Sequence, residues 1–423
     1  MPETAGAATP LPGAPPTPSS RPPSEQVSGA GGGTPRLALL DVLRGAAVLG
    51  TLMTNVWIFT GPGAEWGVLD GTTGSSLHGL LSGASLPEVV ESVFRLLADG
   101  KFLAMLTMLF GVGLAIQFGS AAQRGQPWPG RYRWRALFLL AEGTLHFVLV
   151  FAWDVLMGYA VTALLVAWLL TRSERVRHRV MWTAAGLHVT VMSLLTLGAV
   201  ASDPDGGDGP ARRVVDLYAD GGYLDQIAFR LHNAVALRME PVLSFALLVF
   251  LFLLGVRLHR AGAFAPDAAG RRIRARLLGW GLGVGLPLNI ATGLGGADCF
   301  LLGRYVAAPV VALGYIGLIG VITDRVRRTG PLTAGLTSVG RTALSCYVAQ
   351  NVLCMLAAYG IGLGLAARYR DAGPWWVIGL WAVVCLVLMA ASHLWLRRFP
   401  HGPLESVQKR LLALSANARP PRE

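Results

Sequence analysis

Ten long apolar stretches lie between residues 37 and 396, and they constrain the fold more than any other feature of the chain. They cover residues 37–59, 102–119, 134–152, 155–171, 180–200, 241–256, 277–297, 305–323, 340–364 and 375–396. Each is close to the length needed to cross a lipid bilayer, roughly 20 residues. Backbone polar groups in lipid need internal partners, which a helix supplies. The sequence therefore predicts an all-α, polytopic integral membrane bundle of about ten transmembrane helices.

The composition agrees with a lipid environment. The 423-residue chain is 53 % hydrophobic and only 14 % charged, and its mean hydropathy is +0.51. Soluble domains carry about 25 % charged residues, so this chain lacks the polar surface that a soluble core of this size requires. The four cysteines are scattered over apolar runs and one short connection, a pattern that indicates no disulfide framework.

The basic residues predict the orientation of the helices. The net charge is +12. With the amino terminus in the cytoplasm, 25 of the 36 lysines and arginines fall in inner segments and nine in outer ones. Arginine is disfavoured in translocated loops, so we expect both termini to be cytoplasmic. This asymmetry accounts for most of the positive charge without an acidic partner.

Two membrane regions and two tails organise the chain. Residues 1–35 hold nine prolines and six glycines without apolar periodicity, which predicts a disordered cytoplasmic tail and not a signal peptide. Residues 36–200 form an amino-terminal membrane region with five spans. Residues 201–240 form an extracytoplasmic amphipathic loop, and 241–412 form a carboxy-terminal membrane region with the other five spans. Residues 413–423 form a second cytoplasmic tail.

Two outer connections are long enough to fold. In the first, Ser85 and Glu88 form a capping box ahead of a broad apolar face, which predicts a helix that lies on the membrane or on the bundle without crossing it. The second begins with Asp203, Asp205 and Asp208. A calcium site is one interpretation of these carboxylates, but their spacing is not that of an EF-hand loop, and a solvated loop is favoured.

Ionisable groups inside the spans are few, and each is costly unless it is paired or hydrated. Asp41 and Arg44 lie three residues apart on one face of the first span. They form either a simple ion pair at the membrane surface or a site in which Arg44, oriented by Asp41, holds a phosphate or carboxylate. Asn55 returns to this face about 16 Å further along the helix. Arg341, at the start of the ninth span, lies at a similar depth to Arg44, which predicts an anion site open to the cytoplasm.

A second polar group lies in the third span, where Glu142 and His146 are four residues apart and share one helix face. Histidine accepts and delivers protons near neutral pH, and a carboxylate one turn away favours its protonated form. His146 is therefore a candidate base, with a helix–helix hydrogen bond as the alternative. Asp154, at the outer turn, is predicted to cap the next helix and to orient either His146 or a substrate.

Several motifs are absent from the sequence. It contains no phosphate loop, no dinucleotide fingerprint, no pair of metal ligands at helical spacing and no aromatic-basic pattern for nucleic acid. We therefore expect no bound cofactor, no metal and no nucleic-acid partner. The two halves of the chain also show no convincing similarity to each other, which disfavours an inverted-repeat transporter.

Five groups of short segments occur in the order and spacing of one family. They are Leu40–Gly45; Gly100–Phe102 with Leu109–Gly113; Leu145–His146 with Asp154–Leu156 and Tyr159–Ala160; Gly340–Tyr347; and Gly402–Glu405. In these segments the chain resembles, from about Arg36 to Leu412, the YeiB-like bacterial inner-membrane proteins, whose carboxy-terminal half is a domain of unknown function. The resemblance implies a multi-pass protein of the bacterial cytoplasmic membrane.

The Asp-x-x-Arg-Gly start of this family is similar to that of the heparan-glucosaminide-type transmembrane acetyltransferases. That similarity implies an acyl-CoA co-substrate in the cytoplasm and an acceptor that is extracytoplasmic or lipid-linked. By this resemblance the residues at the donor end are Asp41, Arg44 and Arg341. The candidate catalytic residues are His146, Glu142 and Asp154.

Two other functions fit the same residues. A transporter or exporter of a small anionic or amphipathic metabolite would bind its substrate through the arginines and use Glu142 or Asp154 for proton coupling. A non-catalytic membrane partner would attract anionic lipids to the arginine-rich inner loops, and loss of Arg44 or Arg341 would then damage folding and not activity. The acyltransferase is the leading hypothesis, and the transporter is the second.

Overall fold

The computed structural model describes residues 38–69, 77, 83–201, 211–326 and 330–417. Within these ranges all regular structure is helical. The amino-terminal helices are α1 (Ala38–Thr60), η1 (Ala64–Val68), α2 (Leu86–Ala98), α3 (Lys101–Gln123), α4 (Tyr132–Leu149), α5 (Leu156–Leu169) and α6 (Glu174–Ala201). The short helices that follow are α7 (Arg212–Ala219), α8 (Tyr223–His232), α9 (Ala234–Leu237) and α10 (Met239–Leu243).

The carboxy-terminal half continues the bundle. Its helices are α11 (Phe245–Arg260), α12 (Ala268–Gly283), α13 (Gly285–Leu294), η3 (Ala297–Cys299), α14 (Phe300–Leu302), the π-helix η4 (Gly303–Ala307), α15 (Ala308–Arg325), α16 (Pro331–Arg341), α17 (Ala343–Ala358), α18 (Leu365–Arg368), α19 (Trp375–Leu396) and α20 (Pro403–Asn417). All of them belong to one compact unit, Leu37–Glu423. The predicted disordered tail and the Asp203–Asp208 turn lie outside the described residues.

The prediction of a polytopic helical membrane bundle is confirmed. Each of the ten predicted spans coincides largely with helix. Among the described residues, six helical segments are long and apolar enough to cross a membrane: Ala38–Thr60, Leu86–Gln123, Glu174–Ala201, Ala268–Leu294, Ala297–Arg325 and Trp375–Leu396. Two further predicted spans are shorter apolar helices, α5 and α17. The bundle therefore mixes full-length spans with shorter helices.

Three predicted spans differ from the expected single helices. The predicted span 241–256 consists of the end of α10 and most of α11, which meet at Ser244. The predicted span 277–297 consists of α12 and α13, which meet at Val284. The predicted span 340–364 is wrong at its start, because α16 ends at Arg341 and α17 begins at Ala343. The joining residue Thr342 has φ −117° and ψ 34°, outside helical geometry. Arg341 therefore ends a separate helix and does not lie within the ninth span.

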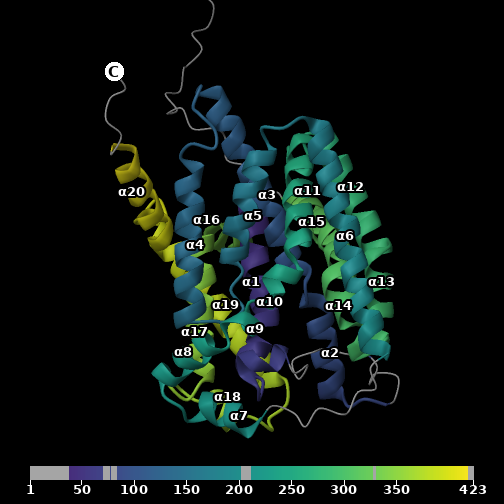
Figure 1. The fold of residues 1–423 in the computed structure, drawn as a ribbon, viewed down its shortest axis with the longest axis vertical. Helices are drawn as coiled ribbons and strands as arrows, with labels where there is room; N and C mark the ends of the chain where they lie inside the picture. The colour runs from purple at the N-terminus through teal and green to yellow at the C-terminus, as the bar shows by residue number, and fades with distance from the viewer. Residues whose placement is uncertain (1–37, 70–76, 78–82, 202–210, 327–329, 418–423) are drawn as a thin grey trace, which may run out of the picture. The chain divides into compact units, whose positions relative to one another are not determined.

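The ends of the helices separate into two groups. Figure 1 shows α20 and the connection between α3 and α4 toward the upper end, and the short helices α7, α8 and α18 at the lower end. The segments predicted to be cytoplasmic thus lie opposite those predicted to be extracytoplasmic. This alternation agrees with the predicted threading of the chain, and the assignment of the upper end to the cytoplasm stays a prediction.

The predicted capping box is present at the start of α2, the helix expected on the outer side. The Glu88 carboxylate accepts a hydrogen bond from the Ser85 backbone N–H at 2.8 Å, and Pro87 occupies the first turn of α2. The apolar face of α2 packs on the bundle through Phe94, whose ring contacts Trp57 of α1 and Trp381 of α19. The predicted helix on the bundle is therefore found.

A buried ion pair fixes the outer loop helices to the bundle. The guanidinium of Arg230 in α8 donates to both carboxylate oxygens of Glu65 at 2.8 and 3.0 Å. Both side chains are fully buried. Arg230 also donates to the carbonyls of Val148 and Val150, each at 3.2 Å, where α4 ends. This pair therefore ties α8, η1 and the end of α4 into one structure.

Tyr218 of α7 completes the cluster around that pair. Its hydroxyl donates to Glu65 at 2.9 Å. Burial, together with the Glu65 carboxylate, raises the pKa of Tyr218 well above its ordinary value. The phenol therefore stays protonated and remains a donor at any physiological pH.

A close helix crossing in the site region joins α1 to α16. A Cβ added to Gly45 would collide with the carbonyl group of Leu336, and one added to Gly340 would collide with the carbonyl group of Asp41. Two of the segments that carry the family resemblance, Leu40–Gly45 and Gly340–Tyr347, therefore meet here through glycine. The backbones approach so closely because neither residue has a side chain.

We expect Gly45→Ala to destabilise the protein by about 1–3 kcal/mol, because the added methyl group must push α16 away from α1. The measurement is the thermal unfolding midpoint of the purified protein in detergent. Gly119→Ala in α3 is the matched control, since no atom lies within 4 Å of a Cβ placed there. Equal midpoints for Gly45→Ala and Gly119→Ala would contradict the proposed close crossing.

Candidate functional site

A chain of buried polar side chains crosses the bundle between α1 and α5. The Asn55 amide of α1 donates to the Asn351 oxygen of α17 at 3.2 Å. The Asn351 nitrogen lies 3.3 Å from Nε2 of His146 in α4, and Nδ1 of His146 lies 3.2 Å from Oδ1 of Asp154. All four residues are buried. The structure thus brings His146 of α4 together with Asp154, which lies in the connection between α4 and α5.

The contacts of Asn351 favour one tautomer of the His146 imidazole. Because Asn351 accepts through its oxygen from Asn55, it presents its N–H to Nε2 of His146. With this assignment the Nε2 lone pair faces Asn351 and the N–H is at Nδ1, where Asp154 Oδ1 lies 3.2 Å away without hydrogen-bond geometry. An imidazole with its lone pair at Nε2 can act as a base at that atom. The predicted alternative, a helix–helix hydrogen bond, is also present as the contact with Asn351.

Asp154 is held on both of its oxygens. Oδ2 accepts from the backbone N–H groups of Leu156 at 2.9 Å and Met157 at 3.3 Å, so the side chain caps the start of α5 as predicted. Oδ1 lies between Nδ1 of His146 and the hydroxyl of Tyr347, which donates at 3.4 Å. The carboxylate therefore lies beside both the imidazole of His146 and the phenol of Tyr347.

Glu142 lies one helical turn before His146 on α4. Both of its carboxylate oxygens are buried and make no hydrogen bond within the part of the chain that the structure describes. A buried carboxylate without a partner is costly, and such groups concentrate at functional sites. The structure thus places Glu142 beside the His146–Asp154 pair without joining it to that pair.

The predicted donor end is located at the crossing of α1 and α16. Arg44 Nη1 lies 3.3 Å from Asp41 Oδ1, and the Arg44 side chain is 30 % exposed. Gly340, the neighbour of Arg341, packs against the Asp41 backbone. The Nε atom of Arg341 is buried and has no hydrogen-bond partner among the described residues. The predicted ion pair is present. Asp41 and Arg44 lie in the first two turns of α1 and Arg341 is the last residue of α16, so all three lie near the crossing of these two helices.

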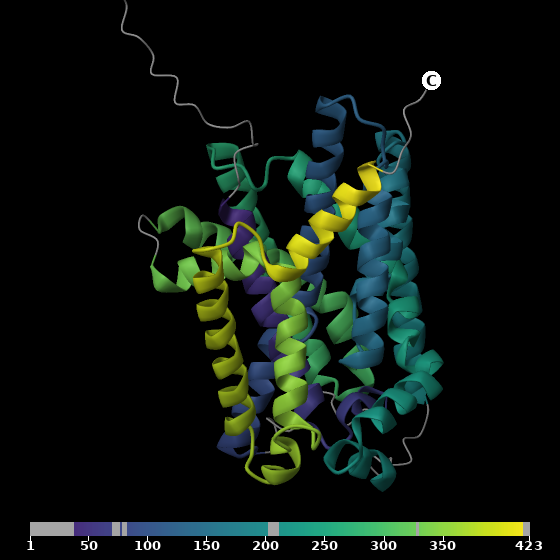
Figure 2. The same ribbon diagram turned by 90° about the vertical axis from the view of Figure 1, so that its left-hand side faces the viewer.

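The start of α17 is fixed by the carboxy-terminal helix. The Glu405 carboxylate of α20 accepts from the Leu344 backbone N–H at 2.9 Å and from the Ser345 hydroxyl. Figure 2 shows the start of α20, in yellow, above the start of α17, in light green. Orphan N–H groups at a helix start need such an acceptor. Since α17 carries Tyr347 and Asn351, Glu405 indirectly supports the site.

Asn351 and Tyr347 had no predicted role. Their four-residue spacing places them on one face of α17, and Tyr347 also ends the segment Gly340–Tyr347 that carries the family resemblance. Their partners His146 and Asp154 lie about two hundred residues earlier in the chain. The pairing is therefore visible only in three dimensions.

The apolar helices and the buried polar chain at their centre define a polytopic helical membrane protein. Residues 258–415 match the family described as "Protein of unknown function (DUF418)". The chain is 25 % identical to the uncharacterized protein YxaH of Bacillus subtilis over 88 % of its length and 92 % of that protein. It is 26 % identical to the uncharacterized protein YeiB of Escherichia coli over 90 % of its length and 97 % of that protein. These similarities, which extend over most of the chain, support the predicted resemblance to the YeiB-like proteins.

Proposed function

We propose that the protein is a transmembrane acyltransferase of the bacterial inner membrane. It moves an acyl group from a cytoplasmic acyl-CoA donor to a hydroxyl or amine of an extracytoplasmic or lipid-linked acceptor. The observation that carries this proposal is the buried imidazole of His146, with Asp154 at Nδ1 and Asn351 at Nε2. An imidazole oriented by a carboxylate is the arrangement that serves as general base in acyl transfer.

In this reaction the acceptor group takes the place of the Asn351 amide at Nε2 of His146. Nε2 accepts the proton as the acceptor oxygen or nitrogen attacks the thioester carbonyl carbon. The carbon–sulfur bond then breaks, and the imidazolium returns its proton to the departing thiolate. Asp154 stabilises the imidazolium, and the freed N–H of Asn351 donates to the oxyanion. His146 ends in the state in which it began.

The donor end lies at the crossing of α1 and α16. Arg44 and Arg341 hold the donor phosphates, and Asp41 orients Arg44 through its 3.3 Å contact. Arg44 and Asn55 are eleven residues apart in α1, about 16 Å along the helix axis. The donor therefore needs an extended arm between its phosphates and its acyl group, and acyl-CoA has such an arm.

The test is reconstitution of the purified protein in liposomes with labelled acetyl-CoA on the side of Arg44. We expect label to appear on at least one member of a panel of sugar, lipid-headgroup and peptidoglycan acceptors. Liposomes without protein provide the control for spontaneous transfer. No label transfer to any acceptor on either side of the membrane would overturn the proposal.

A proton-coupled transporter is the second candidate, and Glu142 is the observation that favours it. Its buried, unpartnered carboxylate resembles the carboxylates that bind and release protons in transporters. In the same liposomes this function predicts flux of a small anionic or amphipathic metabolite that depends on a proton gradient and leaves the metabolite chemically unchanged. Such flux without label transfer would replace the acyltransferase with the transporter.

A further inference from the structure

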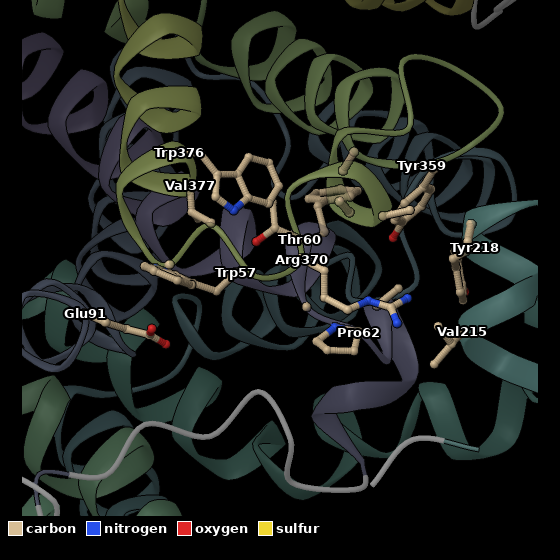
Figure 3. A pocket seen from close by; sticks show the side chains of 18 of the residues that line it. Trp57, Thr60, Pro62, Glu91, Val215, Tyr218, Tyr359, Arg370, Trp376 and Val377 are labelled. Carbon is tan, nitrogen blue, oxygen red and sulfur yellow. The ribbon is translucent and has the colours of Figure 1, made fainter. Parts of the chain in front are cut away.

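A pocket of about 270 Å³ lies at the predicted outer end of α1, away from the His146 site. Its wall combines the end of α1, α2, α7, the end of α17 and the start of α19. Figure 3 shows Trp57 and Trp376 on one side of this pocket and Tyr359 with Tyr218 on the other. Small-molecule sites start at about 300 Å³, so the pocket suits a ligand the size of one sugar ring.

One positive charge in this pocket is uncompensated. Arg95 is already paired with Glu91 at 2.8 Å, and its guanidinium stacks 4.4 Å from the ring centre of Trp57. Arg370 forms no ion pair within the described residues, and Figure 3 shows its guanidinium extending toward the side where Tyr359 and Tyr218 lie. The pocket is thus suited to a ligand with one negative group.

The wall also holds polar atoms without partners. The indole N–H of Trp57 and the hydroxyl of Tyr359 are buried and make no hydrogen bond to the described residues. Buried donors are normally satisfied, and both of these belong to residues that line the pocket. The hydroxyl of Tyr218, by contrast, is occupied by Glu65. Aromatic faces beside unsatisfied donors favour a ring that is apolar on its faces and polar at its edge.

We propose that this pocket binds an anionic, hexose-sized sugar on the outer side of the membrane, with the charged group at Arg370 and the ring between Trp57, Trp376 and Tyr359. The sugar is either soluble or the headgroup of a lipid. The site is defined by its own contacts and does not require acyl transfer, since an enzyme would capture an acceptor here and a transporter would capture a solute. Carboxylate and phosphate are the groups that an unpaired arginine recognises best.

The test is calorimetric titration of the full chain in neutral phosphatidylcholine nanodiscs. The probes are glucuronate, glucose 6-phosphate, glucose and inorganic phosphate. We expect saturable binding of at least one of the two anionic sugars, with binding of glucose and of phosphate alone at least about tenfold weaker, because each makes only part of the contacts. Arg370→Gln should weaken the anionic sugars about tenfold or more and remove the preference over glucose. Tyr359→Phe should weaken every sugar, since it removes a shared donor.

A second experiment tests whether the sugar is a lipid headgroup. It uses native mass spectrometry of the protein purified from nanodiscs that contain phosphatidylinositol. Retention that Arg370→Gln abolishes would identify a lipid headgroup as the source of the sugar. Arg368→Gln is the matched control, because this neighbouring arginine does not line the pocket. The proposal would be overturned if neither anionic sugar nor phosphatidylinositol bound. It would also be overturned if the Arg370→Gln variant bound these ligands as tightly as the unmodified protein. Neither failure bears on label transfer from acetyl-CoA, which is measured separately.

Discussion

His146→Gln is expected to lower the rate of acyl transfer in liposomes by about 10²–10⁴-fold, which is the usual contribution of a general base. Glutamine fits this experiment because its amide retains a hydrogen bond to Asn351 but cannot take up a proton. The stability of the helix contact should therefore change little while the chemistry is lost. The measurements are the initial rate of label transfer and the thermal midpoint of the same preparation.

The matched control for this variant is His393→Gln, which changes an exposed histidine on α19. It should transfer label at the rate of the unmodified protein. If His146→Gln also retains the full rate, His146 is not the base, even if acyl transfer itself has been established. A midpoint that falls in parallel with the rate would instead assign the imidazole the structural role alone.

Arg230→Met is expected to destabilise the protein by about 3–5 kcal/mol, the largest effect on stability that the structure indicates. The cause is Glu65, whose carboxylate would remain fully buried without the two hydrogen bonds at 2.8 and 3.0 Å. The carbonyls of Val148 and Val150 would lose their donor as well. The measurements are denaturant unfolding in detergent and the yield of monodisperse protein.

Two controls make this result specific. Arg213→Met removes an exposed arginine from α7 and should leave stability within about 0.5 kcal/mol of the unmodified protein. The double variant Arg230→Met with Glu65→Leu should recover part of the loss, because no buried charge is then left alone. A double variant that is less stable than Arg230→Met would show that the cost does not come from the stranded carboxylate.

The helices themselves could be predicted because lipid leaves few alternatives. Any apolar segment of sufficient length must satisfy its own backbone, so hydropathy alone locates the spans. The breaks inside them have another origin. Thr342 separates α16 from α17 where Gly340 packs against the Asp41 backbone. That contact joins segments about three hundred residues apart, and no local property of residues 340–364 reveals it.

Three residues of the candidate site could be predicted one by one, but their arrangement and the roles of Asn351 and Tyr347 could not. Asp154 could be expected to cap the next helix from its position at a turn, and Glu142 and His146 from their four-residue spacing. The link from His146 to Asp154 depends on how α4 ends and α5 begins. The link to Asn351 depends on the packing of α17 against α4. Glu65 and Arg230 gave no signal at all, since each is an ordinary charged residue in a loop until both are buried together.

The polar chain from Asn55 to Asp154 draws on both sides of the domain boundary that the family model sets. The match covers residues 258–415 and includes Asn351, Tyr347 and Glu405. Asn55, His146 and Asp154 come from the part of the chain that precedes it. The matched region thus supplies only one part of the polar chain, and the other part comes from the helices that precede it. A polypeptide that carries only the later half would have the amide and the phenol but not the imidazole.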